Sequence, residues 1–225
     1  MSIVHHPDPS NLMCYAAGSL PEPLAAVVAC HIAVCPSCRR DVAMLEIAGA
    51  DLVTSLAGVA MHAEAPRLVA SIAGTVDAHA AKDTARQTVA TRNTNRGADV
   101  PAPLVSLVGP RLDGIAWKYL APGVRHYPLP LSKGAEGDLR LLKVAAGMRM
   151  PEHGHGDAEM TMLLAGAYTD SFGRFATGDV SDLDADSEHQ PIADPDEGCI
   201  CLFATLAPSR YKSPLARLMQ RFTGI

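Results

Sequence analysis

The hydrophobic positions of this chain follow two different rhythms. In roughly the first 80 residues they recur three or four positions apart, which is typical of amphipathic helices. Pro36 opens one of these helices, because proline suits the first helical turn. Ser10 is expected to cap a shorter helix that ends at Gly18. The predicted helices span residues 10–18, 24–34 and 36–56, and a fourth carries Leu68, Ile72 and Val76.

After residue 103 the apolar residues form short runs, separated by Gly, Pro and Asp about every ten residues. This rhythm is typical of a small antiparallel β-sandwich or β-barrel. An amphipathic stretch at residues 214–222 predicts a closing helix. The clearest predicted strands lie within residues 114–120, 137–145, 159–170 and 199–206.

A polar stretch that ends in prolines separates the two rhythms and indicates a linker. The sequence therefore predicts an α+β protein of two domains. A small helical bundle is expected at residues 1–80, a linker at 81–103, and an antiparallel β-barrel at 104–225.

Composition narrows the class of protein. The net charge is -5 and the pI about 6.0, whereas a general nucleic-acid binder normally presents a basic surface, so direct nucleic-acid binding is not expected. The polar start does not look like an export leader, and no apolar run reaches the ~18 residues of a membrane span. We therefore expect a cytoplasmic protein, in which cysteines serve as metal ligands or redox thiols rather than disulfides.

A cluster of cysteines near the N-terminus suggests a metal site. His31 and Cys35 are four residues apart, so a helix brings both onto one face. Pro36 interrupts that helix and lets Cys38 turn back toward the pair. Three such ligands suit a tetrahedral structural Zn²⁺. The ion would pin together helices that are too short to be stable alone.

Spacing alone does not identify the fourth ligand of this site. His5 and His6 both precede the first helix, and spacing does not favour one over the other. Cys14 and Cys30 are the other candidates for the fourth ligand. A Cys-x-x-Cys pair can also be redox-active, although no βαβ unit surrounds this one. Ordinary core cysteines are a further alternative. A nucleic-acid zinc module is disfavoured, because only one such pair occurs and its surroundings are not basic.

A second cluster lies in the predicted β domain. His153 and His155 alternate, so both point to one face of a strand, and Glu159 follows after a glycine-rich corner. His189 can come from a neighbouring strand. A histidine and carboxylate set with an open position suits Zn²⁺, Fe²⁺, Mn²⁺ or Ni²⁺.

The second cluster resembles the cupin motifs. The first motif is matched at every defined position, by Gly147, His153, His155, Glu159 and Gly166. The second motif fits in part, because Gly178 and His189 are correctly spaced. Where the family has proline, glycine and asparagine, this sequence has Asp184, Asp186 and Ala193.

The early histidine and the His-x3-Cys-x2-Cys pattern resemble the zinc-binding anti-sigma domain, and the whole chain resembles a ChrR-type anti-sigma factor. The resemblance implies that the helical domain sequesters an extracytoplasmic-function (group IV) sigma factor. It also implies that the cupin domain is needed for release in response to singlet oxygen or related oxidants. The implied ligands are His6, His31, Cys35 and Cys38 for an N-terminal Zn²⁺, and His153, His155, Glu159 and His189 for a Zn²⁺ or another divalent transition metal in the cupin domain.

A regulatory protein without catalytic residues is therefore the leading expectation. The alternative is a cupin metalloenzyme such as a dioxygenase, in which Glu159 moves protons and the helical module serves assembly. That alternative leaves the His-x3-Cys-x2-Cys module without a role. Within the regulatory interpretation, oxidation of Cys35 and Cys38 to a disulfide is a rival trigger.

Overall fold

The computed structural model describes residues 3–56, 99–213 and 220. The predicted helix around Leu68 to Val76, linker residues 81–98 and nearly all of the predicted closing helix at 214–222 lie outside the described residues. The described parts of residues 1–47 and 99–225 belong to one compact unit. Among the described helices, none is both long and apolar enough to span a bilayer.

Prolines and capping residues mark where the N-terminal helices begin. Asp8, not the expected Ser10, caps the first helix, because Pro9 occupies its first position and the Asp8 carboxylate accepts the backbone N–H of Ser10 at 2.8 Å. The next two helices meet at Pro36, as predicted. The described helices are α1 (Pro9–Ala16), α2 (Glu22–Val34), α3 (Pro36–Ser55) and α5 (Ala102–Val108), the last one directly before the β domain.

After a short 3-10 helix at Leu112–Gly114, the regular structure of the described chain is antiparallel β. An eight-stranded sheet has the order β1-β2-β3-β10-β5-β6, with β7 and β9 also paired to β5, and a three-stranded sheet has the order β11-β4-β8. The pairing among described residues forms these two sheets and not one closed ring. The strands are β1 (Lys118–Ala121), β2 (Val124–Pro128), β3 (Asp138–Val144), β4 (His153–Gly154), β5 (Glu159–Asp170), β6 (Gly173–Ala176), β7 (Val180–Leu183), β8 (Glu188–His189), β9 (Ile192–Ala193), β10 (Cys199–Thr205) and β11 (Arg210–Tyr211). The predicted α+β class is confirmed.

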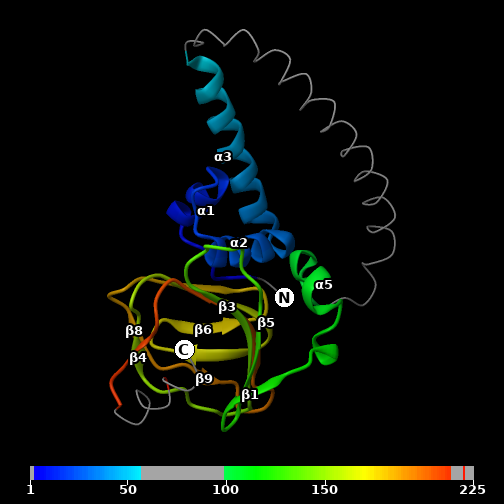
Figure 1. Cartoon of the computed structure of the whole chain (residues 1–225), viewed down its shortest axis with the longest axis vertical. Coiled ribbons are helices and arrows are strands. Elements are labelled where there is room, and N and C mark those ends of the chain that lie inside the picture. The colour runs from blue at the N-terminus through cyan, green and yellow to red at the C-terminus, as the bar shows by residue number, and fades with distance from the viewer. Residues whose placement is uncertain (1–2, 57–98, 214–219, 221–225) are drawn as a thin grey trace. The chain divides into compact units, whose positions relative to one another are not determined.

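The larger sheet is buried on both faces. Leu141 and Leu142 are neighbours on β3, yet they belong to different core clusters, because successive side chains of a strand point to opposite faces. The Leu141 face packs with buried residues of α2 such as Val27 and Val28. The Leu142 face lines the interior of the β domain. Helix α2 therefore contacts β5 and β10, and Figure 1 shows it lying against the sheet.

The apolar positions of α3 do not all serve the core. Val42 is buried and Leu45 is partly buried, as a core-facing stripe predicts. Leu52 is 65% exposed and Leu56, just after the helix, is 66% exposed. Sequence periodicity correctly predicted the helix, whereas only the first half of its apolar stripe is covered within the structure.

Candidate metal centres

The first candidate metal centre forms where α2 ends and α3 begins. One side-chain donor atom from each of four residues lies within 4.8 Å of the others, and these are His6, His31, Cys35 and Cys38. His31 sits in the last turn of α2. Cys35 follows the helix with an extended backbone (φ -101°, ψ 106°), and Cys38 lies in the first turn of α3. The predicted turn at Pro36 thus brings both thiols to the same point as the histidine.

The spacing of the donors suits a tetrahedral ion. The His6 Nδ1 atom lies 3.3 Å from His31 Nε2, 3.5 Å from Cys35 Sγ and 3.3 Å from Cys38 Sγ. For Zn²⁺ with Zn–N near 2.0–2.1 Å and Zn–S near 2.3 Å, tetrahedral ligand atoms stand about 3.3 to 3.8 Å apart. The donor set therefore has the composition and the size of a closed zinc site.

Two further observations support cation binding by this cluster. The Nδ1 atom of His31 lies 3.0 Å from the Gly178 carbonyl, so it must donate its hydrogen there, and the Nε2 lone pair faces the cluster. Burial lowers the pKa of His31 to about 4, which keeps the ring neutral at pH 7. Burial also raises the pKa of Cys38 to about 12, and a bound cation would hold this thiol as the thiolate.

The structure distinguishes among the four candidates for the fourth donor of the first centre. His6 points into the cluster, whereas the ring of His5 packs on Phe175 with their centroids 4.3 Å apart. Cys30 is fully buried in the hydrophobic core, and Cys14 is half-buried outside the cluster. The histidine implied by the family resemblance is therefore the one that the fold brings to the other three donors.

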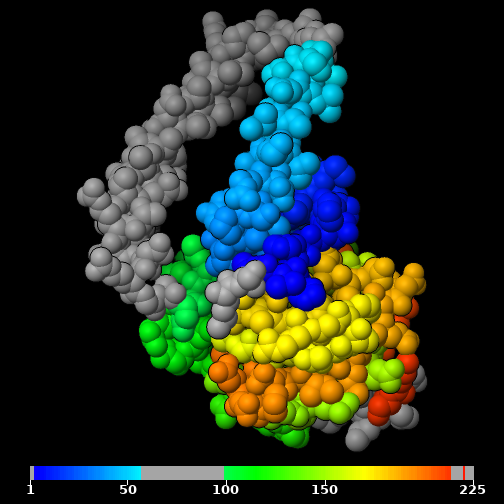
Figure 2. Space-filling model, turned by 180° about the vertical axis from the view of Figure 1, so that it is seen from behind, coloured from blue at the N-terminus to red at the C-terminus, as the bar shows by residue number. Residues whose placement is uncertain are grey.

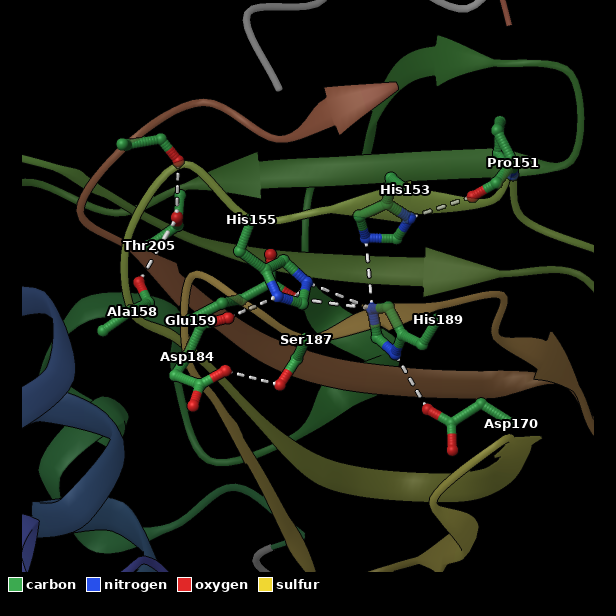
Figure 3. Close-up of polar contacts among 11 residues, drawn as sticks. Pro151, His153, His155, Ala158, Glu159, Asp170, Asp184, Ser187, His189 and Thr205 are labelled. Atoms are coloured by element: carbon green, nitrogen blue, oxygen red, sulfur yellow. Dashed lines mark hydrogen bonds and ion pairs between the residues drawn. The ribbon is translucent and has the colours of Figure 1, made fainter. Parts of the chain in front are cut away.

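The second candidate centre lies inside the β domain. The donor atoms of His153, His155, Glu159 and His189 also fall within 4.8 Å of one another, and all four residues are buried (Figure 3). Strands β4 and β8 pair so that His153 stands opposite His189, which is the neighbouring-strand arrangement expected from the sequence. Glu159 is the first residue of β5.

The outer nitrogen of each ring in this centre is held by an oxygen that can only accept. The Nδ1 atoms of His153, His155 and His189 lie 2.9 Å from the Pro151 carbonyl, 3.2 Å from the Asp184 carbonyl and 2.8 Å from the Asp170 carboxylate, respectively. Each Nδ1 therefore carries its hydrogen.

The inner nitrogens then present three lone pairs to one point. His189 Nε2 is 3.1 Å from His153 Nε2 and 3.3 Å from His155 Nε2. Lone pairs this close repel one another unless a proton or cation lies between them, and burial disfavours the proton by lowering the pKa of His153 to about 4. The arrangement fits a divalent metal.

Glu159 adds a carboxylate to the same point. Its Oε1 lies 3.5 Å from His155 Nε2, while its Oε2 is buried without a hydrogen-bond partner among the described residues. Burial raises the pKa of Glu159 to about 8. A bound cation would supply the missing partner and favour the ionised form. Three imidazoles and one carboxylate suit several divalent transition metals, so the donor set does not select one.

Comparison with known proteins identifies the family of the chain. Residues 108–208 match the ChrR cupin-like domain family. The chain is 38% identical over 225 residues to the anti-sigma-E factor ChrR of Cereibacter sphaeroides, with both chains covered completely. This chain belongs to the ChrR family of anti-sigma factors. It is also similar to a crystal structure of Rhodobacter sphaeroides SigE in complex with the anti-sigma ChrR, with a TM-score of 0.72 and 35% identity over 91% of this chain and 99% of the other.

In this ChrR family member the second centre opens into an apolar cavity of about 360 Å³. His153, Glu159 and His189 form one part of the wall, and most of the rest is apolar. Cys199 and Cys201 of β10 also line it, and burial raises the pKa of Cys199 to about 11, so this thiol is protonated at pH 7. No Lys or Arg appears among the described lining residues.

The departures from the second cupin motif leave the ligand in place. Asp184 and Asp186 form a turn in which the Asp184 carboxylate accepts the backbone N–H of Asp186 and the hydroxyl of Ser187. Ala193 is buried in β9 beside Tyr168. His189 still reaches the centre through its pairing with β4. An aspartate turn thus substitutes for the proline and glycine that the motif usually carries.

The sequence predicts the donors that converge at both candidate centres, but it does not predict the groups that orient them. Asp170, whose side chain is fully buried, fixes His189, and its only sequence signal is its place at the end of the same strand that begins with Glu159. The other orienting groups are the backbone carbonyls of Pro151, Gly178 and Asp184, for which a sequence carries no side-chain signal.

Proposed function

We propose that this protein is a cytoplasmic anti-sigma factor that sequesters an extracytoplasmic-function (group IV) sigma factor and does not contact nucleic acid directly. Residues 1–80 would form the sigma-binding domain and residues 81–103 the linker. The cupin domain at 104–225 would sense singlet oxygen or related oxidative stress and cause release. The observation that carries the proposal is the full-length identity to an anti-sigma-E factor, because it spans both the helical and the cupin region.

The first centre is proposed to hold Zn²⁺ through His6, His31, Cys35 and Cys38. When bound, the ion supplies a covalent-like link between the segment before α1, the end of α2 and the start of α3. The second centre is proposed to hold Zn²⁺ or another divalent transition metal through His153, His155, Glu159 and His189. Both assignments rest on the convergence of the donor atoms and on the orientation of the histidine rings.

Exposed apolar side chains on the described helices support a partner-binding role. Met44 and Ile47 of α3 are 69% and 63% exposed, and Met13 of α1 is 55% exposed. Single exposed apolar residues are common, but several on neighbouring helices are typical of a surface that another protein covers. The apolar face of a zinc-pinned helix pair is a surface that a sigma factor can bind, in the manner of helix-in-groove recognition.

Co-expression with a cognate group IV sigma factor tests sequestration. Wild-type protein is expected to co-purify with the sigma factor and with zinc, whereas His31→Ala, which removes a buried donor of the first centre, is expected to lose the sigma factor and about one zinc ion per chain. His126→Ala, on strand β2 away from both centres, is the matched control and should retain both. Failure of the wild-type protein to bind any group IV sigma factor would remove the proposal.

The same assay separates two release triggers. If the Cys35 and Cys38 thiolates have a structural role, replacing both by serine abolishes sigma binding even without oxidant. If they are the switch, the serine variant still binds the sigma factor but no longer releases it on oxidation. A signal at the cupin centre predicts instead that the sigma binding of His153→Ala no longer changes on exposure to singlet oxygen.

A cupin metalloenzyme, such as a dioxygenase, is the second candidate. The observation that favours it is the apolar cavity against His153, Glu159 and His189, because such a cavity can hold an organic substrate at a metal. Oxygen uptake by Fe²⁺-loaded protein with diketone or flavonol substrates tests it. Turnover that His153→Ala abolishes would support the enzyme, and the absence of turnover would argue against it.

A further inference from the structure

Strand β7 connects the two candidate metal centres. The carbonyl of Gly178, just before β7, accepts the Nδ1 hydrogen of His31 at 3.0 Å. The carbonyl of Asp184, just after β7, accepts the Nδ1 hydrogen of His155 at 3.2 Å. Each centre therefore contains one histidine whose ring is oriented by a backbone oxygen from the same short stretch, residues 178–184.

The N-terminal segment, residues 3–8, also depends on this stretch. The Asp179 carboxylate accepts the backbone N–H groups of Val4 at 2.7 Å and His5 at 3.1 Å, and the Val180 N–H donates to the His5 carbonyl at 3.1 Å. Figure 2 shows the blue N-terminal residues lying directly on the yellow strands of the β domain. His6, the next residue, is thereby fixed in place on its N-terminal side.

A second carboxylate of the stretch holds the other end of the N-terminal segment. The Asp182 Oδ2 atom accepts the backbone N–H of Asp8 at 2.8 Å and the side-chain amide of Asn11 at 2.8 Å. His6 therefore lies between two anchor points that both come from residues 178–184. Both carboxylates act on the ligand through the backbone and are positioning residues.

The stretch is also tied to the second centre through the sheet. Strand β7 pairs with β5 so that Leu183 stands opposite Glu159, one of the donors of that centre. Asp179, Val180 and Ser181 are each at most 3% exposed. A close-packed element of this kind moves as a unit rather than deforming gradually, so a shift at Glu159 or Asp184 must also shift Asp179 and Gly178.

We propose that residues 178–184 couple the two metal centres, so that occupancy of the cupin centre raises the metal affinity of the His6–His31–Cys35–Cys38 centre. This inference rests on the proposed function in requiring that both centres bind metal. Coupling between binding sites is reciprocal and commonly amounts to a 5- to 150-fold change in affinity. Loss or modification of the cupin metal would then loosen the zinc that pins the helices, which gives a physical route from sensor to sigma-binding surface.

Cobalt titration of the full-length, metal-stripped chain tests the coupling. Only the first centre contains thiolates, so the thiolate-to-Co²⁺ charge-transfer absorption reports its occupancy alone. His153→Ala impairs the cupin centre without removing any contact to residues 178–184, because His153 bonds Pro151 and lies on β4. We expect the Co²⁺ affinity of the first centre to be about tenfold lower in His153→Ala than in wild type.

Variants of the stretch then test the route. The quantity compared is the first-centre Co²⁺ affinity with His153 present divided by that with His153→Ala, which is about ten in the otherwise wild-type chain. Asp182→Ala is expected to reduce this ratio toward one. Asn11→Ala removes one of the two contacts of Asp182, leaves the buried strand unchanged, and is expected to have a smaller effect. Asp196→Ala, exposed on the loop before β10, is the matched control and should leave the ratio unchanged. A merely destabilised protein would lose affinity equally with and without His153.

The outcomes distinguish this inference from the proposed function. A wild-type protein that binds metal at both centres, with equal first-centre affinity in His153→Ala, overturns the coupling and leaves the metal sites intact. An unchanged ratio in both Asp182→Ala and Asn11→Ala overturns the route through β7. A protein without thiolate-to-Co²⁺ absorption and without metal in the cupin centre overturns the proposed metal sites instead.

Discussion

Replacing Glu159 by glutamine should stabilise the metal-free protein and weaken its metal binding. Burial raises the pKa of this carboxyl from 4.5 to about 8, and the residue is only 3% exposed. Because the pKa of Glu159 is higher in the folded than in the unfolded state, the folded state favours the protonated carboxyl. The stability that this side chain contributes is therefore fully present below pH 4.5 and is lost as the pH rises through about 8. At pH 7 most of this loss has occurred, and at 1.36 kcal/mol per pKa unit it amounts to about 3 kcal/mol. Glutamine keeps the shape of the side chain and has no charge to bury.

Urea unfolding of chelator-treated protein measures this effect. Glu159→Gln is expected to exceed wild type by about 3 kcal/mol at pH 7 and by less than about 1 kcal/mol at about pH 5. Added Zn²⁺ should reverse the order, because wild type binds the ion more tightly and binding to the folded state stabilises it. Glu197→Gln, on the exposed loop before β10, is the control and should change little. A metal-free Glu159→Gln protein that is no more stable than wild type at pH 7 would refute the reasoning.

Three further outcomes are expected. Cys38→Ala should lower the zinc content by about one ion per chain, whereas Cys30→Ala, in the core but outside the cluster, should retain it; elemental analysis decides. Asp170→Asn, which weakens the bond that orients His189, should reduce metal affinity of the cupin centre by about 10- to 100-fold in a competition assay with a chelator. Gly166→Ala should lower the unfolding free energy by more than about 2 kcal/mol, because φ is +69° and the added Cβ would meet a backbone oxygen, and an unchanged urea midpoint would contradict this.

The donors that converge at the two candidate centres could be identified from the sequence because they are metal-binding side-chain types at short spacing. His31 and Cys35 were expected to share a helical face. In the structure Cys35 follows the end of α2 with an extended backbone, and the turn before α3 brings its thiol to His31. Alternation and a glycine-rich corner did the same for His153 and Glu159. The apolar run at residues 159–170, which predicted a strand, forms β5.

The attachment of the helices to the cupin domain was not predictable from periodicity. The described parts of residues 1–47 and 99–225 share one compact unit with a common hydrophobic core. The pattern of α2 indicates burial on most of its surface, but it does not identify the sheet as the partner. Long-range contacts such as the hydrogen bond from Val4 to Asp179 depend on which surfaces pack together, and the local spacing of residues does not indicate which surfaces these are.

The departures from the second cupin motif show why the turn can vary while the site persists. The side chain at position 184 differs from the expected proline, but the group that orients His155 is the backbone carbonyl of this residue, which every amino acid supplies. The same holds for Gly178, whose carbonyl holds His31 and whose positive φ of +96° and close contact with Ile3 are what require glycine. The side chains that the two centres need are therefore the donors and the glycine of the tight turn, whereas the orienting carbonyls follow from the path of the backbone through residues 178–184. A substitution that displaces this strand should disturb both centres at once, even though it changes no ligand.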